Sequence, residues 1–263
     1  MQYNIIECDS LLRTITKKDT LFSGNYCIDP YQYCEFGCKY CDSSFEKKIF
    51  VKKNSEKILD KELQTKQKGT IIIGSVHDPY QPAEQTYEMT KKILKVIKKH
   101  NFPCHILTKS ILIQRDINLI SSMNCTVTIS ILSLNKKISQ LFEHKVSSTQ
   151  NRLEIVKTLV EHNIITGVAL IPIMPYINDG EIQQIIKEIK NKKPYYILHK
   201  YLELKGEQKQ IFFSLLQQQY PDLLSTYTII YNNTIRPKKE YIKTIDNQIH
   251  QYCKKCNISQ KIQ

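Results

Sequence analysis

Apolar residues along this chain fall into short runs that alternate with longer segments of mixed polarity. Five of the runs are rich in β-branched residues and have the length of buried strands. They cover residues 70–73, 104–108, 125–132, 164–173 and 195–204. The intervening segments predict helices, several with apolar residues three or four positions apart. These helical segments cover residues 55–66, 82–100, 111–123, 149–162 and 180–192.

Regular alternation of strands and helices is typical of parallel sheets joined by right-handed crossovers. With one further strand at or before residue 34, the pattern predicts an α/β fold with six strand–helix units, a partial (β/α)6 TIM-like barrel. Residues 208–219 and 238–252 predict two more helices, which Pro221 helps to separate. We therefore expect a partial barrel over residues 1–205 and a helical extension over residues 206–263, packed on the same domain.

Composition narrows the class of protein. The chain has 263 residues, of which 41% are hydrophobic, and it contains no long apolar run that would suggest a membrane segment. Its first residues lack the basic, apolar and small-residue pattern of an export signal. Nine cysteines in a chain without that signal are typical of a reducing compartment, where thiols bind metals. We expect a cytoplasmic protein without a membrane partner.

The formal net charge of +13 leaves two interpretations open. An excess of cations suits a polyanionic substrate such as nucleic acid. However, the cations are nearly all lysine, with arginine only at positions 13, 115, 152 and 236. A gene rich in A and T would inflate lysine without any ligand, and specific phosphate contacts favour arginine.

Three cysteines, Cys34, Cys38 and Cys41, form a C-x3-C-x2-C array in which Tyr40 precedes the last cysteine. Closely spaced thiolates suit an iron–sulfur cluster, and three of them leave one iron of a [4Fe–4S] cluster open to another ligand. An odd number of cysteines cannot pair off as disulfides within the array. A zinc site remains the alternative, although no fourth ligand lies nearby in the chain.

Polar residues follow several of the predicted strands. Ligands of parallel β/α folds gather at the carboxyl ends of strands, so these residues are candidates for a binding site. They comprise the segment 74–84 after the second strand, Thr108, Lys109 and Ser110 after the third, Ser130 in the fourth, Asn178 and Asp179 after the fifth, and His199 and Lys200 in the sixth. Each of them taken alone is more typical of a cap or a solvated turn, and it is their repeated placement at strand ends that favours a site.

The array with its aromatic residue resembles the signature of radical S-adenosylmethionine (SAM) enzymes. That resemblance implies a [4Fe–4S] cluster on Cys34, Cys38 and Cys41, with SAM chelated at the open iron and Tyr40 near its adenine. It also implies an external electron donor such as flavodoxin or ferredoxin. Reduction would then cleave SAM to a 5′-deoxyadenosyl radical that abstracts hydrogen from a substrate.

Further motifs resemble the branch related to spore photoproduct lyase. They are Asp-Pro-Tyr-Gln-Pro-x-Glu from position 78, Ile-Leu-Thr-Lys-Ser from position 106 and Pro-Ile-x-Pro-x-Ile-Asn-Asp from position 172. The resemblance implies that Lys109 and Ser130 contact the SAM carboxylate. It likewise implies that Asp78 contacts the nucleoside or amino group and that Gly74 and Ser75 help to hold the methionine amino group.

The chain departs from this branch at Ser75, where spore photoproduct lyases carry a cysteine that returns a hydrogen atom to thymine. An O–H bond is much stronger than an S–H bond, so Ser75 would be a poor donor, and Tyr80 is the nearby redox-active candidate. Ser75 and Tyr80 are therefore the candidate catalytic residues. A nucleic-acid base is the leading substrate, and radical modification of a peptide or small metabolite is an alternative. A metal-bearing, basic protein that binds nucleic acid without catalysis is another.

The chain ends with Cys253 and Cys256 in a C-x2-C pair, three residues after His250. These residues could hold an auxiliary cluster or zinc. Because a full ligand set is not visible locally, we interpret the pair as two free thiols at a frayed terminus.

Overall fold

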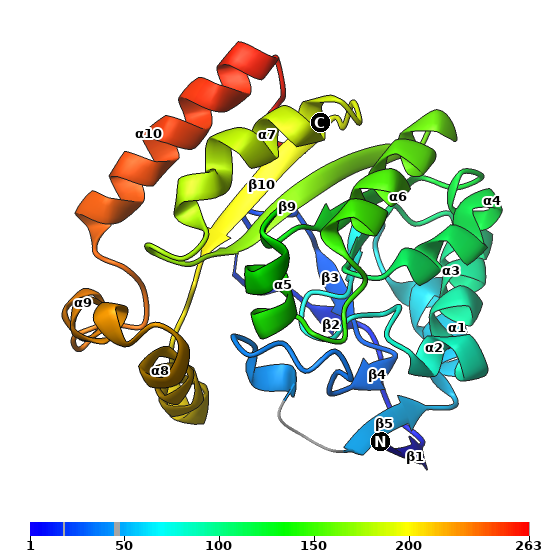
Figure 1. Ribbon diagram of the computed structural model, residues 1–263. Coiled ribbons are helices and arrows are strands. Elements are labelled where there is room, and N and C mark those ends of the chain that lie inside the picture. The colour runs from blue at the N-terminus through cyan, green and yellow to red at the C-terminus, as the bar shows by residue number, and fades with distance from the viewer. Residues whose placement is uncertain (18, 45–47, 263) are drawn as a thin grey trace.

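The main sheet of the computed structural model contains seven strands in the order β10-β9-β8-β7-β6-β3-β2. The structure describes residues 1–17, 19–44 and 48–262. The strands are β2 (Arg13–Thr14), β3 (Tyr26–Ile28), β6 (Ile71–Ile73), β7 (Cys104–Thr108), β8 (Cys125–Ser130), β9 (Ile165–Ile173) and β10 (Tyr196–Tyr201). All neighbours from β3 to β10 pair in parallel, and only β2 is antiparallel to its neighbour (Figure 1).

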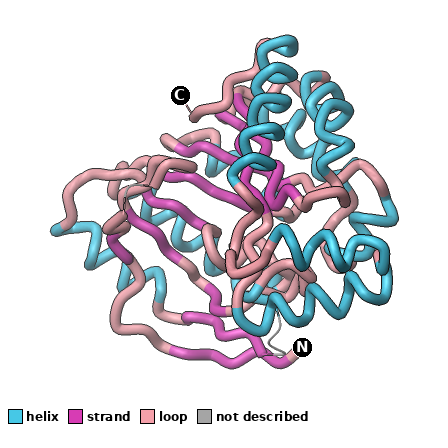
Figure 2. The backbone as a smooth tube through the Cα atoms, turned by 90° about the vertical axis from the view of Figure 1, so that its left-hand side faces the viewer, coloured by secondary structure: helices cyan, strands magenta, loops and turns pink. Residues whose placement is uncertain are grey.

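Helices connect consecutive parallel strands, which confirms the predicted partial (β/α)6 barrel with its cysteine loop after the first strand of the series. They are α1 (Ser55–Thr65), α2 (Ala83–Tyr87), α3 (Met89–Lys99), α4 (Ile117–Ile120), α5 (Lys136–Phe142), α6 (Thr149–Glu161) and α7 (Ile182–Lys190). Figure 2 shows the strands as one slanting row with helices outside it. No helix in the described part of the chain is long and apolar enough to cross a membrane.

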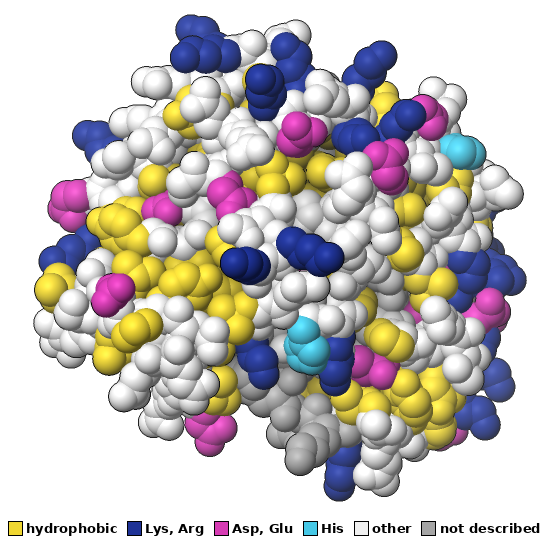
Figure 3. All heavy atoms as spheres, viewed as in Figure 1, with side chains coloured by type: hydrophobic (Ala, Val, Ile, Leu, Met, Phe, Trp, Pro, Cys, Tyr) yellow, Lys and Arg dark blue, Asp and Glu magenta, His cyan; other side chains and the backbone are white. Residues whose placement is uncertain are grey.

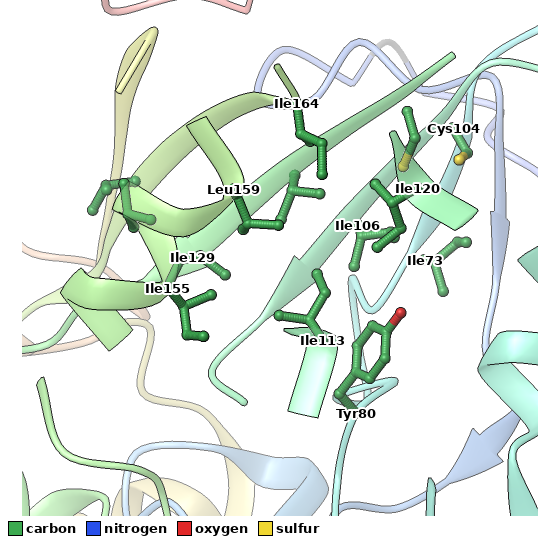
Figure 4. Close-up of a cluster of buried hydrophobic side chains, with 14 of the residues drawn as sticks. Ile73, Tyr80, Cys104, Ile106, Ile113, Ile120, Ile129, Ile155, Leu159 and Ile164 are labelled. Carbon is green, nitrogen blue, oxygen red and sulfur yellow. The ribbon is translucent and has the colours of Figure 1, made fainter. Parts of the chain in front are cut away.

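Isoleucine-rich packing joins the helices to the outer face of the sheet. Ile73, Ile106 and Ile129 project from three neighbouring strands toward Ile113 and Leu159 (Figure 4). All five side chains are almost fully buried. Because side chains alternate along a strand, the residues next to these isoleucines in each strand face the interior of the barrel. The sheet thus has an apolar outer face, and its inner face is free to carry polar residues.

A second, smaller sheet was not predicted. It pairs β5 (Lys48–Lys52) with β1 (Gln2–Ile6) and β4 (Tyr31–Gln32). Most of β1 is exposed or half-buried, so its apolar residues form no recognisable pattern. Edge strands of this kind are specified by their partners more than by their own sequence.

The single helix predicted over residues 82–100 is wrong, because the chain breaks it at Glu88. Glu88 has a φ of 50° and separates α2 from α3. The fully buried Glu84 carboxylate accepts hydrogen bonds from the backbone N–H groups of Thr90 (2.8 Å) and Lys91 (3.2 Å). It thereby satisfies donors at the start of α3, which is what a cap does.

Two other helix predictions also differ from the structure. Residues 111–123 form a 3₁₀ segment, η2 (Ile111–Asp116), followed by the single turn α4. Helix α5 lies between residues 132 and 149, where no helix was predicted, and its side-chain cap is Asn135. The seven residues of α5 are too few to show a clear helical period.

The C-terminal segment contains α8 (Gly206–Gln219), α9 (Leu224–Ile230) and α10 (Lys239–Cys256). Helix α10 packs on α7, and the residues after it reach β10 through a bridge between Tyr196 and Ser259 (Figure 1). The frayed terminus was therefore a wrong expectation.

The terminal C-x2-C pair lies within α10. Cys253 is buried in the core, Cys256 is half-buried, and both are free thiols. His250 instead pairs its Nδ1 with Gln260 Oε1 at 2.9 Å. Residues 1–17, 19–44 and 48–262 include no three His, Cys, Asp or Glu side chains that could hold a single metal ion. At this terminus Cys253 packs in the core and His250 already has a partner.

Candidate functional site

A cavity of about 250 Å³ opens at the carboxyl ends of the parallel strands. The cysteine loop, the ends of β6, β7, β9 and β10 and the start of α8 all contribute to its lining. The lining residues include Cys34, Cys38, Tyr40, Cys41, Gly74, Ser75, Asp78, Lys109, Pro172, Tyr201, Lys205 and Gln208. We call this cavity the barrel-mouth site. It brings together most of the residues that the sequence marked out.

The three array cysteines all line the barrel-mouth site. Cys34 and Cys38 are buried and Cys41 is half-buried, beside Phe36. Burial raises the pKa of Cys34 to about 12, so its thiol keeps its proton unless a metal replaces it. Three thiolates on one short loop can bind one [4Fe–4S] cluster and leave one iron open to another ligand.

Lys109 directly follows β7 and lines the barrel-mouth site together with Lys200 and Lys205. Its Nζ lies 5.9 Å from the centroid of the Tyr40 ring. Burial lowers the pKa of Lys109, but the negative charge of Glu143, followed by Cys38 and Asp78, outweighs burial and raises it overall. The side chain is therefore an ammonium at neutral pH. Such a group can pair with a carboxylate.

Asp78 stabilises the end of β7 through hydrogen bonds. Its carboxylate accepts hydrogen bonds from the Thr108 hydroxyl (2.7 Å) and from the backbone N–H groups of Lys109 (2.7 Å) and Tyr80 (2.9 Å). These three donors come from the protein itself. In this structure Asp78 thus shapes the loop and positions Lys109, although it also lines the cavity.

Gly74 follows β6 with a φ of 92°, a conformation that favours glycine. A Cβ at this position would lie 2.3 Å from the Leu107 carbonyl oxygen and 2.6 Å from Pro79 Cδ. The next residue, Ser75, is exposed and lines the barrel-mouth site. The glycine therefore allows the loop to pass close to β7 and to present Ser75 at the cavity.

Ser130 and Tyr80 do not line the barrel-mouth site. Ser130 ends β8, is 1% exposed and directs its Oγ to the Ile171 carbonyl at 3.4 Å. Tyr80 is also 1% exposed and donates its hydroxyl to Asp116 Oδ2 at 3.1 Å. It packs among the outer-face isoleucines and borders a separate cavity (Figure 4).

The remaining strand-end candidates are engaged elsewhere. The Asn178 amide bonds the backbone of Met174, Leu132 and Pro172, and Asp179 accepts the Tyr241 hydroxyl. His199 pairs with Asp246 at 2.8 Å. These three side chains therefore have structural partners, while Lys200 lines the cavity.

The sequence did not mark out Gln208, which lines the site, or Glu143 and Arg152, which lie behind Tyr40. The Tyr40 hydroxyl donates to Glu143, Arg152 pairs with the same carboxylate, and Gln208 donates to the Tyr40 carbonyl oxygen. Only Arg152 carried a signal, as one of four arginines in a lysine-rich chain.

Comparisons with known proteins agree with this geometry. The family model of the radical SAM superfamily matches residues 28–189. An uncharacterised protein of Methanocaldococcus jannaschii is 32% identical, with 85% of each chain covered. An uncharacterised protein of Mycobacterium tuberculosis is 24% identical over 87% of this chain and 73% of its own length.

Solved structures show the same fold at low identity. A spore photoproduct lyase variant superposes with a TM-score of 0.75 and 15% identity, over 96% of this chain and 79% of its own. Streptococcus suis SuiB bound to SAM gives a TM-score of 0.62 at 14% identity, over 90% of this chain and 49% of its own.

The matched family spans most of the barrel, including the cysteine array and the ends of β6, β7 and β9, whereas β10 and α8 lie beyond the match. Members of this family are enzymes that use a [4Fe–4S] cluster and SAM, and they need a source of electrons. The resemblance inferred from the cysteine array is therefore confirmed. This chain belongs to the radical SAM superfamily.

Proposed function

We propose that this radical SAM enzyme acts on a nucleic-acid base, with its chemistry at the barrel-mouth site. The observation that carries the site assignment is that one cavity is lined by three array thiols and by the Lys109 ammonium. Cys34, Cys38 and Cys41 would hold the cluster. When bound, the cluster and SAM supply a 5′-deoxyadenosyl radical after reduction by a donor such as flavodoxin or ferredoxin.

The chain's own residues would bind and orient SAM. Lys109 would pair with the SAM carboxylate, because its ammonium is half-buried and lies 5.9 Å from the centroid of the Tyr40 ring. The Tyr40 ring would pack near the adenine, and the loop at Gly74 and Ser75 would approach the methionine amino group. The Ser130 side chain is buried and does not line the cavity. Ser130 would therefore help to bind SAM by fixing the position of the end of β8 rather than by direct contact.

The fold supports a nucleic-acid substrate more than a peptide. One similar structure is a spore photoproduct lyase complexed with dinucleoside spore photoproduct, matched over 96% of this chain at a TM-score of 0.73. SuiB bound to its precursor peptide matches at 0.57 and over 47% of its own length. The net charge of +13 is consistent with a polyanion. Lysines are nevertheless spread over the face seen in Figure 3 rather than gathered in one patch.

The reaction would differ from thymine repair in how hydrogen is returned. Ser75 has a strong O–H bond, and the Tyr80 hydroxyl is bound to Asp116 away from the cavity. We therefore propose that Tyr80 does not donate a hydrogen atom to the substrate radical. The substrate radical would be resolved without a side chain from the loop 74–84. It would either lose one electron to an acceptor such as the cluster, together with a proton, and become a modified base, or recover a hydrogen atom from the methyl group of 5′-deoxyadenosine.

The test is anaerobic reconstitution with iron and sulfide, followed by incubation with SAM and dithionite. Separate reactions would contain dinucleotide spore photoproduct, a mixed-sequence oligonucleotide or a mixed peptide pool. We expect 5′-deoxyadenosine or label exchange into SAM above the substrate-free background only with nucleic acid, together with a mass change in the nucleic acid. The Cys38→Ala protein is the control for SAM-dependent chemistry.

Two results would change the proposal. A response only to peptides would replace nucleic acid by the peptide alternative. Conversion of spore photoproduct to two thymines would show that the serine at position 75 does not prevent repair.

A further inference from the structure

A continuous chain of contacts links the cysteine loop to the end of β8. The Tyr40 hydroxyl donates to Glu143 Oε1. The other oxygen of Glu143 accepts from Arg152 NH2 at 2.7 Å, and Arg152 NH1 donates to the Ser130 carbonyl oxygen at 2.7 Å. One end of this chain thus lies between two cluster cysteines. The other lies at the strand end expected to face SAM.

The same loop segment has two more anchors. The backbone N–H of Lys39 donates to the Phe142 carbonyl oxygen at 3.0 Å, at the end of α5. Gln208 Nε2 donates to the Tyr40 carbonyl oxygen from the first turn of α8. Glu143 directly follows Phe142, so α5 holds the loop by both a backbone and a side-chain contact. The placement of residues 39 and 40 is therefore determined by distant segments.

Stability alone is a poor reason for burying this ion pair. Arg152 is 1% exposed and Glu143 is 2% exposed, so both charges have lost nearly all their water. Removing water from such a pair costs about as much as, or more than, the attraction returns. Arg152 Nε has no hydrogen-bond partner in the described part of the chain, which adds a further cost. Apolar residues of similar volume would stabilise the core at least as well.

We propose that Arg152 and Glu143 are positioning residues that hold the cysteine loop, through Tyr40, in a fixed place relative to Ser130 and the SAM-binding strand ends. The inference rests on the site assignment made above. Arginine is required because its planar fork reaches an acceptor on each side, whereas a lysine ammonium is a point donor on a flexible stem. Neither residue needs to touch SAM for this role.

The chain offers a matched control for the experiment. Glu84 is also a buried carboxylate that accepts a tyrosine hydroxyl, from Tyr31, and an arginine NH2, from Arg115 at 2.6 Å. None of these three residues lines the barrel-mouth site. Glu84→Gln therefore disturbs a comparable buried network whose hydrogen bonds reach Tyr31 but not residues 38–41.

The variants are Tyr40→Phe, Arg152→Lys, their double mutant and Glu84→Gln, each reconstituted anaerobically and compared at equal iron content. The measurements are SAM affinity by titration, the change that SAM causes in the EPR spectrum of the reduced cluster, and Tm. We expect each single change at the site to weaken SAM binding about tenfold, the scale of one charge-assisted hydrogen bond. The double mutant should lose no more than the worse single variant, because both act through one chain of contacts.

Glu84→Gln should lower Tm while leaving SAM affinity and the EPR change intact. Tyr40→Phe keeps the ring and is expected to fold. It therefore tests the proposal even if the Arg152→Lys protein does not fold. Unchanged SAM affinity in Tyr40→Phe, a roughly hundredfold additive loss in the double mutant, or an equal loss in Glu84→Gln would overturn the proposal. A wild-type protein that assembles no cluster would instead refute the site assignment.

Discussion

The backbone N–H of Lys109 donates to the Asp78 carboxylate at 2.7 Å, which ties the end of β7 to the loop after β6. The contact fixes the backbone from which the Lys109 ammonium projects. It separates two roles that the sequence did not distinguish, since Lys109 offers a charge to a ligand and Asp78 holds that charge in place.

Lys109→Ala and Asp78→Ala should therefore differ in their effects. Removing the ammonium should weaken SAM binding by about 1.5–3 kcal/mol and change Tm little. Asp78→Ala leaves the Lys109 N–H without its acceptor and should lower the free energy of unfolding by about 1–3 kcal/mol, with a smaller loss of SAM affinity. Titration calorimetry and thermal melting would separate the two effects. Unchanged SAM affinity in Lys109→Ala would refute the carboxylate contact.

The metal content gives a direct prediction for the cysteines. Anaerobically reconstituted protein should contain about four irons and four sulfides per chain. Cys34→Ala, Cys38→Ala and Cys41→Ala should each lose the cluster, whereas Cys256→Ala should retain it because α10 lies outside the site. Stoichiometric zinc in protein purified without added iron, with no capacity for iron and sulfide, would favour the zinc alternative.

Gly74→Ala should be strongly destabilising. Its φ of 92° disfavours any Cβ, and the added atom would meet the Leu107 carbonyl oxygen. We expect a loss of about 1–3 kcal/mol or more in the free energy of unfolding, together with weaker SAM binding. Gly180→Ala is the matched control, because a Cβ there has nothing within 4 Å and the φ is not in the left-handed range. Equal denaturant midpoints for the two variants would contradict this account.

His105 predicts a pH dependence of stability. Its ring pairs with the Thr128 hydroxyl inside the barrel, and burial lowers its pKa from 6.5 to about 4. Between these values the unfolded chain binds a proton that the folded chain does not, so stability falls as pH drops from about 6.5 toward 4. Protonation of His105 in the unfolded chain should lower the free energy of unfolding by about 3 kcal/mol at pH 4. His105→Gln, which keeps a hydrogen-bonding side chain, should show a shallower decline of Tm over this range than the wild type.

The parallel sheet could be predicted from the sequence because its strands are rich in apolar and β-branched residues and alternate with helical segments. The break at Glu88 could not, because it depends on Glu84, whose partners Tyr31 and Arg115 lie far away in the chain. The small sheet was missed because β1 is mostly exposed and acquires its conformation from β5. The boundary at residue 205 remains a prediction.

The site residues also divide into those that local sequence reveals and those that depend on distant contacts. The cysteines and Lys109 could be found from local spacing and from their position at a strand end, although their roles remain predictions. The orientation of Tyr80 depends on the turn that Asp78 closes and on Asp116, which local sequence does not reveal. Glu143 lies 103 residues from Tyr40, so no motif could join them.

The contact from Gln208 to the Tyr40 carbonyl has a consequence for how the enzyme tolerates air. The barrel is open on one side, and Gln208, with Lys205 and its partner Asp42 at 3.4 Å, lies where the segment after β10 meets the cysteine loop. Gln208→Ala would keep every proposed cluster ligand and Lys109, yet lose this contact. Its cluster should assemble and then bleach faster under oxygen than that of the wild type, so α8 would protect the lifetime of the cofactor.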